Sequence, residues 1–172
     1  SNLLAFSRKS KLEFSEVDIN ELLKKCILLS EHRLTLQNIR IESRLDTDMP
    51  RVLGDFNQLQ QCVINLIFNA IDAMPEGGVV TIESSYNSDK NVVEVAISDS
   101  GTGIPKEDLN YIFDPFFTTK KEGKGLGLGL STVYGIIDRH KGTISVQSES
   151  GKGTRFVLKL PLTGYVGEIS GN

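Results

Sequence analysis

The segment from Asp55 to Asp72 constrains the fold more than any other part of the sequence. Asp55 is a suitable helix N-cap with Gln58 three residues later, and Pro75 and Gly77 end the segment. Apolar residues recur inside it at the i, i+3, i+4, i+7 spacing of one helix face: Leu59, Cys62, Val63, Leu66, Ile67, Ala70 and Ile71. We therefore expect an amphipathic helix that buries one face against a second layer of structure.

The rest of the sequence predicts two further helices and about five strands. The helices are expected over residues 18–36 and 127–139, and the strands over 39–45, 79–86, 91–98, 142–149 and 154–161. Helical and strand segments do not alternate one for one along the chain, so a doubly wound sheet is not expected. The order of the elements favours an α+β two-layer sandwich.

Composition narrows the class of protein. With 172 residues, 39% of them hydrophobic and 24% charged, the chain is expected to form one globular domain. A net charge of −3 argues against a nucleic-acid partner, and no apolar run approaches the ~18 residues of a membrane span. Two cysteines without a CxxC motif indicate neither a disulfide framework nor a zinc site.

The two ends of the chain lack the patterns of its centre. Residues 1–17 begin with a short apolar segment and continue with charges and serines, as a connector does. Residues 162–172 have no periodic pattern and are expected to be a tail or linker. The folded domain is therefore predicted to cover residues 18–161.

Two asparagines lie one turn apart on the polar face of the predicted helix over 55–72. Asn65 and Asn69 are mediocre helix formers in a strong helix, so their presence invites an explanation. An amide carbonyl oxygen is a ligand that Mg²⁺ accepts alongside waters and phosphate oxygens. A solvated helix face is the alternative explanation of the same pair.

Asp99 ends a predicted strand and is followed by Gly101 and Gly103. A carboxylate at that place is a fixed acceptor for an exocyclic amine such as that of adenine, and glycines let a flat ligand approach the backbone. An ordinary strand-ending turn uses the same residue types, so that alternative stays open.

Two further segments have the composition of a phosphate-binding site and its cover. Residues 123–131 carry four alternating glycines and lead directly into a helix, where exposed backbone N–H groups bind anions. The run is neither a Walker A loop nor a dinucleotide-binding fingerprint. Residues 113–121 combine phenylalanines with two lysines, which is typical either of a lid that closes on a site or of a loop held to the core by its aromatic residues.

These segments together carry a resemblance to a known family. NLIFNAIDAM, DSGTGIP, FDPFFTTK and GKGLGLGLS resemble the N, G1, F and G2 boxes of sensor histidine kinases, in the superfamily that includes DNA gyrase and ATP-driven heat-shock chaperones. The resemblance spans about residues 18–161. LLAFSR near the start is similar to the end of the dimerisation helix that precedes this domain. FFTTK and LSTVYGII most resemble nitrogen-regulation-type and hybrid kinases.

The resemblance implies a Bergerat fold, with a mixed sheet of about five strands covered on one face by three helices. It also implies binding of ATP and Mg²⁺. Asn69 would hold the metal, and Asn65 and Lys120 would assist catalysis, although Lys121 is an alternative to Lys120. The residues implied in nucleotide binding are Asn69, Asp72, Asp99, Gly101, Gly103, Ile104, Phe117, Thr118, Lys120, Gly125, Leu126, Gly127, Leu128, Gly129 and Thr154.

Two positions depart from the family pattern. Leu126 stands where the family usually has threonine or serine, which puts a polar contact to phosphate or lid in doubt. Lys141 stands where the family often has glycine, and we expect little consequence. His140 precedes it and is expected at a helix C-terminus, where a cation suits the helix dipole.

The implied activity is that of a protein-histidine kinase catalytic domain. Its partners would be the phosphoacceptor dimerisation helices of the same parent kinase and the receiver domain of a response regulator. The acceptor of this family is a histidine followed by an acidic residue, whereas His32 precedes Arg33 and His140 precedes Lys141. We expect the isolated domain to be monomeric, not embedded in a membrane and cytoplasmic, with anchoring of the parent left open.

Three other functions compete with this interpretation. An ATPase switch of the chaperone or mismatch-repair class is disfavoured because hydrolytic relatives tend to carry glutamate at the position of Asn65. A serine/threonine-directed kinase of the anti-sigma type is disfavoured by the LLAFSR and FFTTK segments. A degenerate module without nucleotide is disfavoured by the intact glycines and Asp99.

Overall fold

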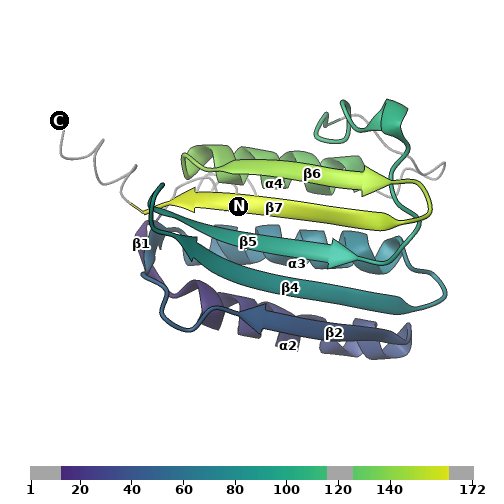
Figure 1. Cartoon of the computed structure of the whole chain (residues 1–172), viewed down its shortest axis with the longest axis horizontal. Helices are drawn as coiled ribbons and strands as arrows, with labels where there is room; N and C mark the ends of the chain where they lie inside the picture. The colour runs from purple at the N-terminus through teal and green to yellow at the C-terminus, as the bar shows by residue number, and fades with distance from the viewer. Residues whose placement is uncertain (1–12, 116–125, 163–172) are drawn as a thin grey trace, which may run out of the picture.

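A mixed five-stranded sheet forms one of the two layers of the molecule (Figure 1). The computed structural model describes residues 13–115 and 126–162, and of residues 126–128 only the backbone. In spatial order the strands are β2 (Ile39–Leu45), β4 (Gly78–Asn87), β5 (Val92–Asp99), β7 (Gly153–Pro161) and β6 (Thr143–Glu149). β2 runs parallel to β4, and all other neighbours in this sheet are antiparallel.

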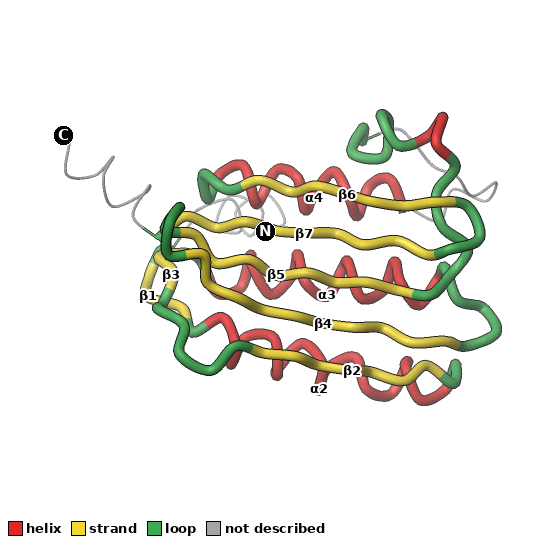
Figure 2. The backbone as a smooth tube through the Cα atoms, in the orientation of Figure 1, coloured by secondary structure: helices red, strands yellow, loops and turns green. Residues whose placement is uncertain are grey.

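Three helices cover one face of the sheet (Figure 2). They are α2 (Ile19–Leu36), α3 (Phe56–Asp72) and α4 (Leu126–Arg139). In Figure 1, α2 lies behind β2, α3 behind β5, and α4 behind β6 and β7, and no described helix covers the opposite face. The α+β two-layer sandwich with a mixed sheet is confirmed, and so is its one-sided cover of helices.

The helices begin at the predicted caps and bury the predicted faces. The side chain of Asp55 accepts a hydrogen bond from the backbone N–H of Gln58 at 3.0 Å, and Asp18 does the same for Glu21 at 3.1 Å. All seven apolar residues of the α3 stripe are at most 3% exposed. The stripe packs on core-facing valines and isoleucines of β4 and β5, so burial of this one face holds the two layers together.

Both cysteines belong to this core. Cys26 of α2 and Cys62 of α3 are each 0% exposed. Burial raises the pKa of each thiol to about 12, because the thiolate is poorly solvated there. Both therefore act as small apolar residues rather than as redox groups.

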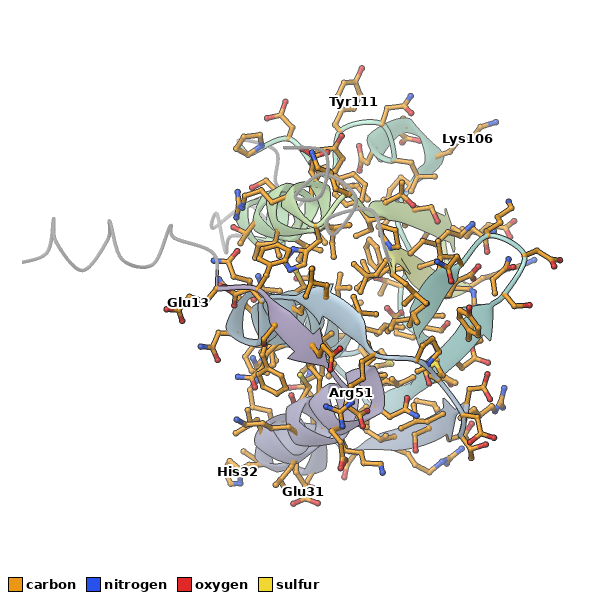
Figure 3. All side chains as sticks on the ribbon, turned by 90° about the vertical axis from the view of Figure 1, so that its left-hand side faces the viewer. Glu13, Glu31, His32, Arg51, Lys106 and Tyr111 are labelled. Carbon is orange, nitrogen blue, oxygen red and sulfur yellow. The ribbon has the colours of Figure 1, made fainter. Side chains whose placement is uncertain are left out.

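A second, two-stranded sheet lies at one end of the sandwich and was not predicted from the sequence. β1 (Ser15–Val17) pairs antiparallel with β3 (Val52–Gly54), and Val17 is 2% exposed. Figure 3 faces this end, with Glu13 just before β1 and Arg51 just before β3. The chain thus packs on the domain before α2 begins, whereas the boundary at residue 17 stays a prediction.

His140 lies directly after α4, at the helix C-terminus where it was expected, but it is not a cation. It is 3% exposed, and its Nδ1 donates to the carbonyl of Ile136 at 2.8 Å. Its Nε2 accepts from the backbone N–H of Asp55 at 3.0 Å, so the ring is neutral. Burial lowers its pKa below the usual 6.5.

The next residue departs from expectation as well. Lys141 has φ of 61°, in the left-handed region where glycine is favoured. Its N–H donates to the carbonyl of Asp138 at 3.0 Å and ends the helix. The replacement of the family glycine by Lys141 therefore carries a backbone cost, contrary to the expectation of little consequence.

The open face of the sheet is polar. Arg155 of β7 contacts Glu83 of β4 at 2.7 Å and Ser98 of β5 at 3.2 Å, while Arg44 of β2 lies 3.6 Å from the other oxygen of Glu83. These contacts join four strands across the face. Within the described ranges, no helix is long and apolar enough to cross a membrane.

Candidate functional site

A cavity of about 230 Å³ lies where the helical layer meets the end of β5. Six residues predicted to bind nucleotide line it: Asn69, Asp72, Asp99, Gly103, Ile104 and Thr154. They come from α3, from the end of β5 and the segment after it, and from β7. The fold thus brings together residues up to 85 positions apart in the sequence, because α3 and β5 end, and the antiparallel β7 begins, at the same side of the domain.

Five further lining residues were missed in the sequence. They are Ala73, Thr102, Pro105, Leu130 and Phe156. Leu130 and Phe156 occupy apolar positions of a helix and a strand, so periodicity alone assigns them to the core. Thr102 and Pro105 belong to the DSGTGIP motif, and their place in it was the available signal. The apolar members give the cavity a wall suited to the face of a flat ring.

Asn69 faces the cavity with an incomplete set of hydrogen bonds. It is half-buried, and its amide nitrogen is buried without a hydrogen-bond partner among the described residues. An amide that is desolvated without a partner destabilises the fold, so the site favours a ligand that completes its bonding. Asn65, one turn earlier, instead contacts the start of α4, where its Nδ2 donates to the carbonyl of Gly129 at 3.4 Å.

Asp99 is a half-buried carboxylate at the cavity, and among the described residues it is not part of an ion pair. Its Oδ1 accepts a hydrogen bond from the N–H of Gly101 at 2.8 Å, and the backbone of Thr154 also donates to the carboxylate. Burial raises the pKa of Asp99 above the usual 3.8, and these two bonds oppose that rise. The structure therefore holds the Asp99 carboxylate, a strong hydrogen-bond acceptor, in a fixed direction inside a largely apolar cavity.

The two glycines after Asp99 are required by packing. A Cβ on Gly101 would collide with the carbonyl of Ala73 at the end of α3, and one on Gly103 with the carbonyl of Glu149. Gly103 also has φ of +77° and lines the cavity, whereas Gly101 does not line it. The loop is thus clamped between α3 and the β6–β7 hairpin. For Gly101, a direct ligand contact stays a prediction.

Thr154 and Ile104 are held by a residue that sequence reasoning did not single out. The hydroxyl of Ser148 on β6 accepts from the N–H of Ile104 at 2.7 Å and lies 2.8 Å from the hydroxyl oxygen of Thr154. Thr154 is 6% exposed and lines the cavity. Serines are common on strands, so nothing in the sequence marks Ser148 as special.

The glycine-rich run continues into the first turn of α4. The first three residues of α4 are Leu126, Gly127 and Leu128, whose N–H groups have no partner within the helix. Gly129 is the fourth residue, and the N–H at that position of a helix bonds to the N-cap carbonyl, as Leu22 and Leu59 do in α2 and α3. A Cβ at Gly129 would meet no atom within 4 Å, so the glycine is not required there by packing. The helix terminus therefore has the geometry of an anion site beside the cavity wall formed by Leu130.

Asp72 lies at the cavity but also forms a half-exposed ion pair with Arg33 of α2, at 3.5 Å. The remaining predicted contacts lie outside the described residues: Phe117, Thr118, Lys120 and Gly125. The alternative lysine, Lys121, lies outside them as well. Their roles stay predictions. Within the described ranges, no cluster of three His, Cys, Asp or Glu side chains could hold a metal ion.

Comparison with known proteins agrees with the geometry. Residues 54–164 match the family described as histidine kinase-, DNA gyrase B-, and HSP90-like ATPase. Sporulation kinase C of Bacillus subtilis is 41% identical over 163 residues, which are 94% of this chain and 37% of that protein.

Solved structures show the same relationship. The nucleotide-free catalytic domain of the histidine kinase ThkA is 37% identical, with a TM-score of 0.78 over 87% of this chain and 96% of that one. ThkA in complex with the response regulator TrrA is 35% identical, with a TM-score of 0.77 over 94% of this chain and 46% of that one.

The resemblance noted in the sequence is thereby confirmed. The chain spans little more than a third of the length of Sporulation kinase C, whereas it corresponds to almost all of the isolated ThkA domain. The match covers the capped helix α3, the cavity and the strands behind it. The chain belongs to the histidine kinase-, DNA gyrase B- and HSP90-like ATPases, and within them it is a catalytic domain of the histidine kinase type.

Proposed function

We propose that this domain binds ATP with Mg²⁺ and presents the γ-phosphoryl group to a histidine on the dimerisation helices of its parent protein. The observation that carries the proposal is the cavity itself. It combines one fixed carboxylate, Asp99, with an incompletely bonded amide, Asn69, beside a helix N-terminus. Asp99 supplies a hydrogen-bond acceptor for the base, Asn69 an oxygen ligand for the metal, and the N-terminus of α4 N–H donors for the phosphates.

The adenine end of the nucleotide is assigned to Asp99. A carboxylate fixed by the N–H of Gly101 and of Thr154 keeps lone pairs for the exocyclic amine of adenine. A 6-oxo purine would set its own oxygen against that carboxylate. Leu130 and Phe156 would pack on the faces of the ring.

The residues fit Mg²⁺ in the manner typical of phosphate-bound magnesium. The amide oxygen of Asn69 is a hard ligand suited to Mg²⁺. The amide nitrogen of the same side chain, which has no partner among the described residues, would donate to a phosphate oxygen or to a water on the metal. When bound, the metal would neutralise charge on the phosphates. The N–H groups at the start of α4, that of Gly127 among them, would add donors to the phosphate oxygens, whereas a contact of Gly129 stays a prediction.

The site favours transfer to a partner over hydrolysis. Asn65 cannot accept a proton from water at neutral pH, and its amide is already engaged with the carbonyl of Gly129. Phosphoryl transfer depends mainly on positioning and charge neutralisation, which the described residues supply. The acceptor must therefore come from elsewhere.

Neither histidine of the chain is suited to be that acceptor. His140 is buried and both of its ring nitrogens are bonded. His32 points away from the molecule on α2 (Figure 3) and is followed by Arg33. We therefore assign the acceptor to the dimerisation helices of the parent, in the cytoplasm, with relay to a response-regulator receiver. The complex of ThkA with TrrA supports that class of partner.

A binding experiment tests the nucleotide assignment. Asp99→Ala should weaken ATP binding by about ten- to a hundredfold, the loss of ~1.5–3 kcal/mol expected for a charge-assisted hydrogen bond. Asn69→Asp should weaken ATP with Mg²⁺ far more than metal-free ADP. Asn57→Asp is the matched control, since it adds the same charge on the exposed start of the same helix. Calorimetric titration that shows equal ATP and GTP affinities would refute the assignment.

A transfer experiment tests the kinase assignment. With γ-labelled ATP and Mg²⁺, the domain alone should form no acid-labile, base-stable phosphate. Addition of the parent's dimerisation helices should produce label on those helices, slowly and in proportion to concentration, because no tether raises the effective concentration. Label on this chain without a partner would contradict the division into two domains.

A further inference from the structure

The hydroxyl of Ser148 makes three contacts at the rim of the cavity. It lies 2.7 Å from the backbone nitrogen of Ile104, 2.9 Å from the carbonyl of Gly153 and 2.8 Å from the hydroxyl oxygen of Thr154. Ile104 and Thr154 both line the cavity, whereas Ser148 itself does not. Ser148 therefore joins two walls of the site from outside it.

The chemistry of the partners fixes the direction of each of these bonds. The carbonyl of Gly153 can only accept, so it takes the single hydroxyl proton of Ser148. The N–H of Ile104 can only donate, and it occupies one lone pair of Ser148. With its own proton used, Ser148 can only accept from Thr154, so the proton of the Thr154 hydroxyl points at Ser148.

This arrangement makes the Thr154 hydroxyl a hydrogen-bond acceptor, and not a donor, toward the cavity. Its hydroxyl proton is committed to Ser148, so the oxygen offers only lone pairs to a ligand. Thr154 is also paired with Asp99 across β5 and β7, and its backbone donates to that carboxylate. The cavity thus presents two neighbouring acceptors and no hydroxyl donor from this pair.

We infer that Ser148 is a positioning residue for nucleotide selection, which acts through Thr154 to favour a purine with a 6-amino group over one with a 6-oxo group. The inference rests on the proposed function, since it assumes that the base lies beside Asp99. Without Ser148, the hydroxyl of Thr154 rotates freely and donates to a 6-oxo group. Discrimination then rests on Asp99 alone.

The second bond of Ser148 has a separate effect. Because it anchors the N–H of Ile104, loss of Ser148 also loosens the wall formed by residues 102–105. That wall contacts any purine, so its loosening weakens ATP and ITP equally. The ratio of the two dissociation constants therefore isolates the effect through Thr154, because ITP differs from ATP only at the 6-position and the protonation of the ring.

The experiment measures ATP and ITP affinities of six proteins by calorimetry: wild type, Ser148→Ala, Thr154→Val, the double variant, Ser148→Thr and Ser145→Ala. Ser148→Ala should lower the ITP-to-ATP ratio of dissociation constants about three- to tenfold, the size of one neutral hydrogen bond. Ser148→Thr, which keeps the hydroxyl, should restore the ratio. Ser145→Ala, an exposed serine of the same strand on the opposite face, should leave it unchanged.

The double variant identifies the route of the effect. In the Thr154→Val background, Ser148→Ala should lower both affinities without further change in their ratio. A ratio that is unchanged in Ser148→Ala but changed in Thr154→Val overturns the inference and leaves the proposed function intact. A ratio that still responds to Ser148→Ala in the Thr154→Val background also overturns it. A wild type that fails to prefer ATP over ITP overturns the proposed function itself.

Discussion

The neutral imidazole of His140 accepts a hydrogen bond from the backbone N–H of Asp55, 85 residues away in the sequence. The ring follows the end of α4, and Asp55 is the N-cap of α3, so one side chain joins the ends of two helices. Phe14 stacks on the same ring with centroids 4.7 Å apart, and the N–H of Glu13 donates to Asp55. The segment before β1 is thereby bound to the same junction.

Acidification should destabilise the domain through His140. Its pKa is lowered in the folded state by burial and by Arg139, against the opposing effects of Ile136 and Asp55. As the pH falls below the usual 6.5, the unfolded chain takes up a proton that the folded chain refuses, so the free energy of unfolding falls. A proton on Nε2 would also break the hydrogen bond from the backbone N–H of Asp55, because both groups would then be donors.

Urea unfolding between pH 7.5 and 5.5 measures this effect. His140→Gln should be less stable than wild type at pH 7.5, because Asp55 keeps at best a poorer acceptor, but its stability should vary less with pH. His32→Gln, at an exposed position of α2, is the control and should keep the wild-type slope. A flattened slope in His32→Gln alone would contradict the assignment to His140.

A comparison of Gly103 with Gly151 distinguishes two reasons for a glycine near the cavity, a left-handed backbone and the lack of room for a Cβ. Both have positive φ, of +77° and +81°, but a Cβ collides with the carbonyl of Glu149 only at Gly103. Gly151→Ala should therefore cost only about 0.5–1 kcal/mol in the free energy of unfolding, because the left-handed strain of about 1–2 kcal/mol is partly offset by the lower entropy of the unfolded chain. Gly103→Ala should cost more and also weaken ATP binding. Equal losses of stability in the two variants would show that the collision is relieved elsewhere.

Lys141 offers a stabilising substitution. Lys141→Gly should relieve about 1–2 kcal/mol of strain from the left-handed backbone, but the more flexible unfolded chain should cost ~0.4–1 kcal/mol. We therefore expect the free energy of unfolding to rise by ~0.5–1 kcal/mol. Lys141→Ala, which removes the long side chain but keeps Cβ, should bring no gain. Thermal unfolding distinguishes the two variants. A gain in both would place the cost in the lysine side chain instead of the backbone.

Asp99 should reduce the stability of the ligand-free domain. Burial raises its folded pKa, so the free energy of unfolding falls as the pH rises from the usual 3.8 through the raised value. Asp99→Asn keeps an oxygen for the N–H of Gly101 but carries no charge, and should unfold at a higher temperature than wild type at pH 7. The rise in unfolding temperature that ATP gives to wild type should be lost.

Asp89→Asn serves as the control for this prediction. Asp89 lies exposed in the turn between β4 and β5, and the substitution there should leave both unfolding temperatures unchanged. A ligand-free Asp99→Asn variant that unfolds below wild type would show that the carboxylate stabilises the loop more than its burial costs.

The main layers were predictable because they are encoded in local periodicity. The α3 stripe, its Asp55 cap and the alternating β5 each depend on residues within one element. The pairing of β1 with β3 was not predictable, since each strand has three residues and the two lie 35 positions apart. A three-residue strand has no readable period.

The site was predictable where a residue's type is unusual for its element. Asn69 on a strong helix and Asp99 at a strand end met that condition. Ser148 and Phe156 did not, because a serine and an apolar residue are ordinary on a strand and acquire a role only through long-range packing. The place of His140 at a helix C-terminus was predictable, but its neutral state was not, because its bonding partner lies 85 residues away.

Because the thiols of Cys26 and Cys62 are buried, we expect the native protein not to react with thiol reagents. A cysteine introduced at an exposed position, as in Tyr111→Cys, would be the only nucleophilic thiol near neutral pH, since Tyr111 is 56% exposed. A fluorophore or spin label attached there would report on the segment after β5 without prior removal of the natural cysteines. Distances to a labelled partner could then be measured in a chain that differs from the natural sequence at one position.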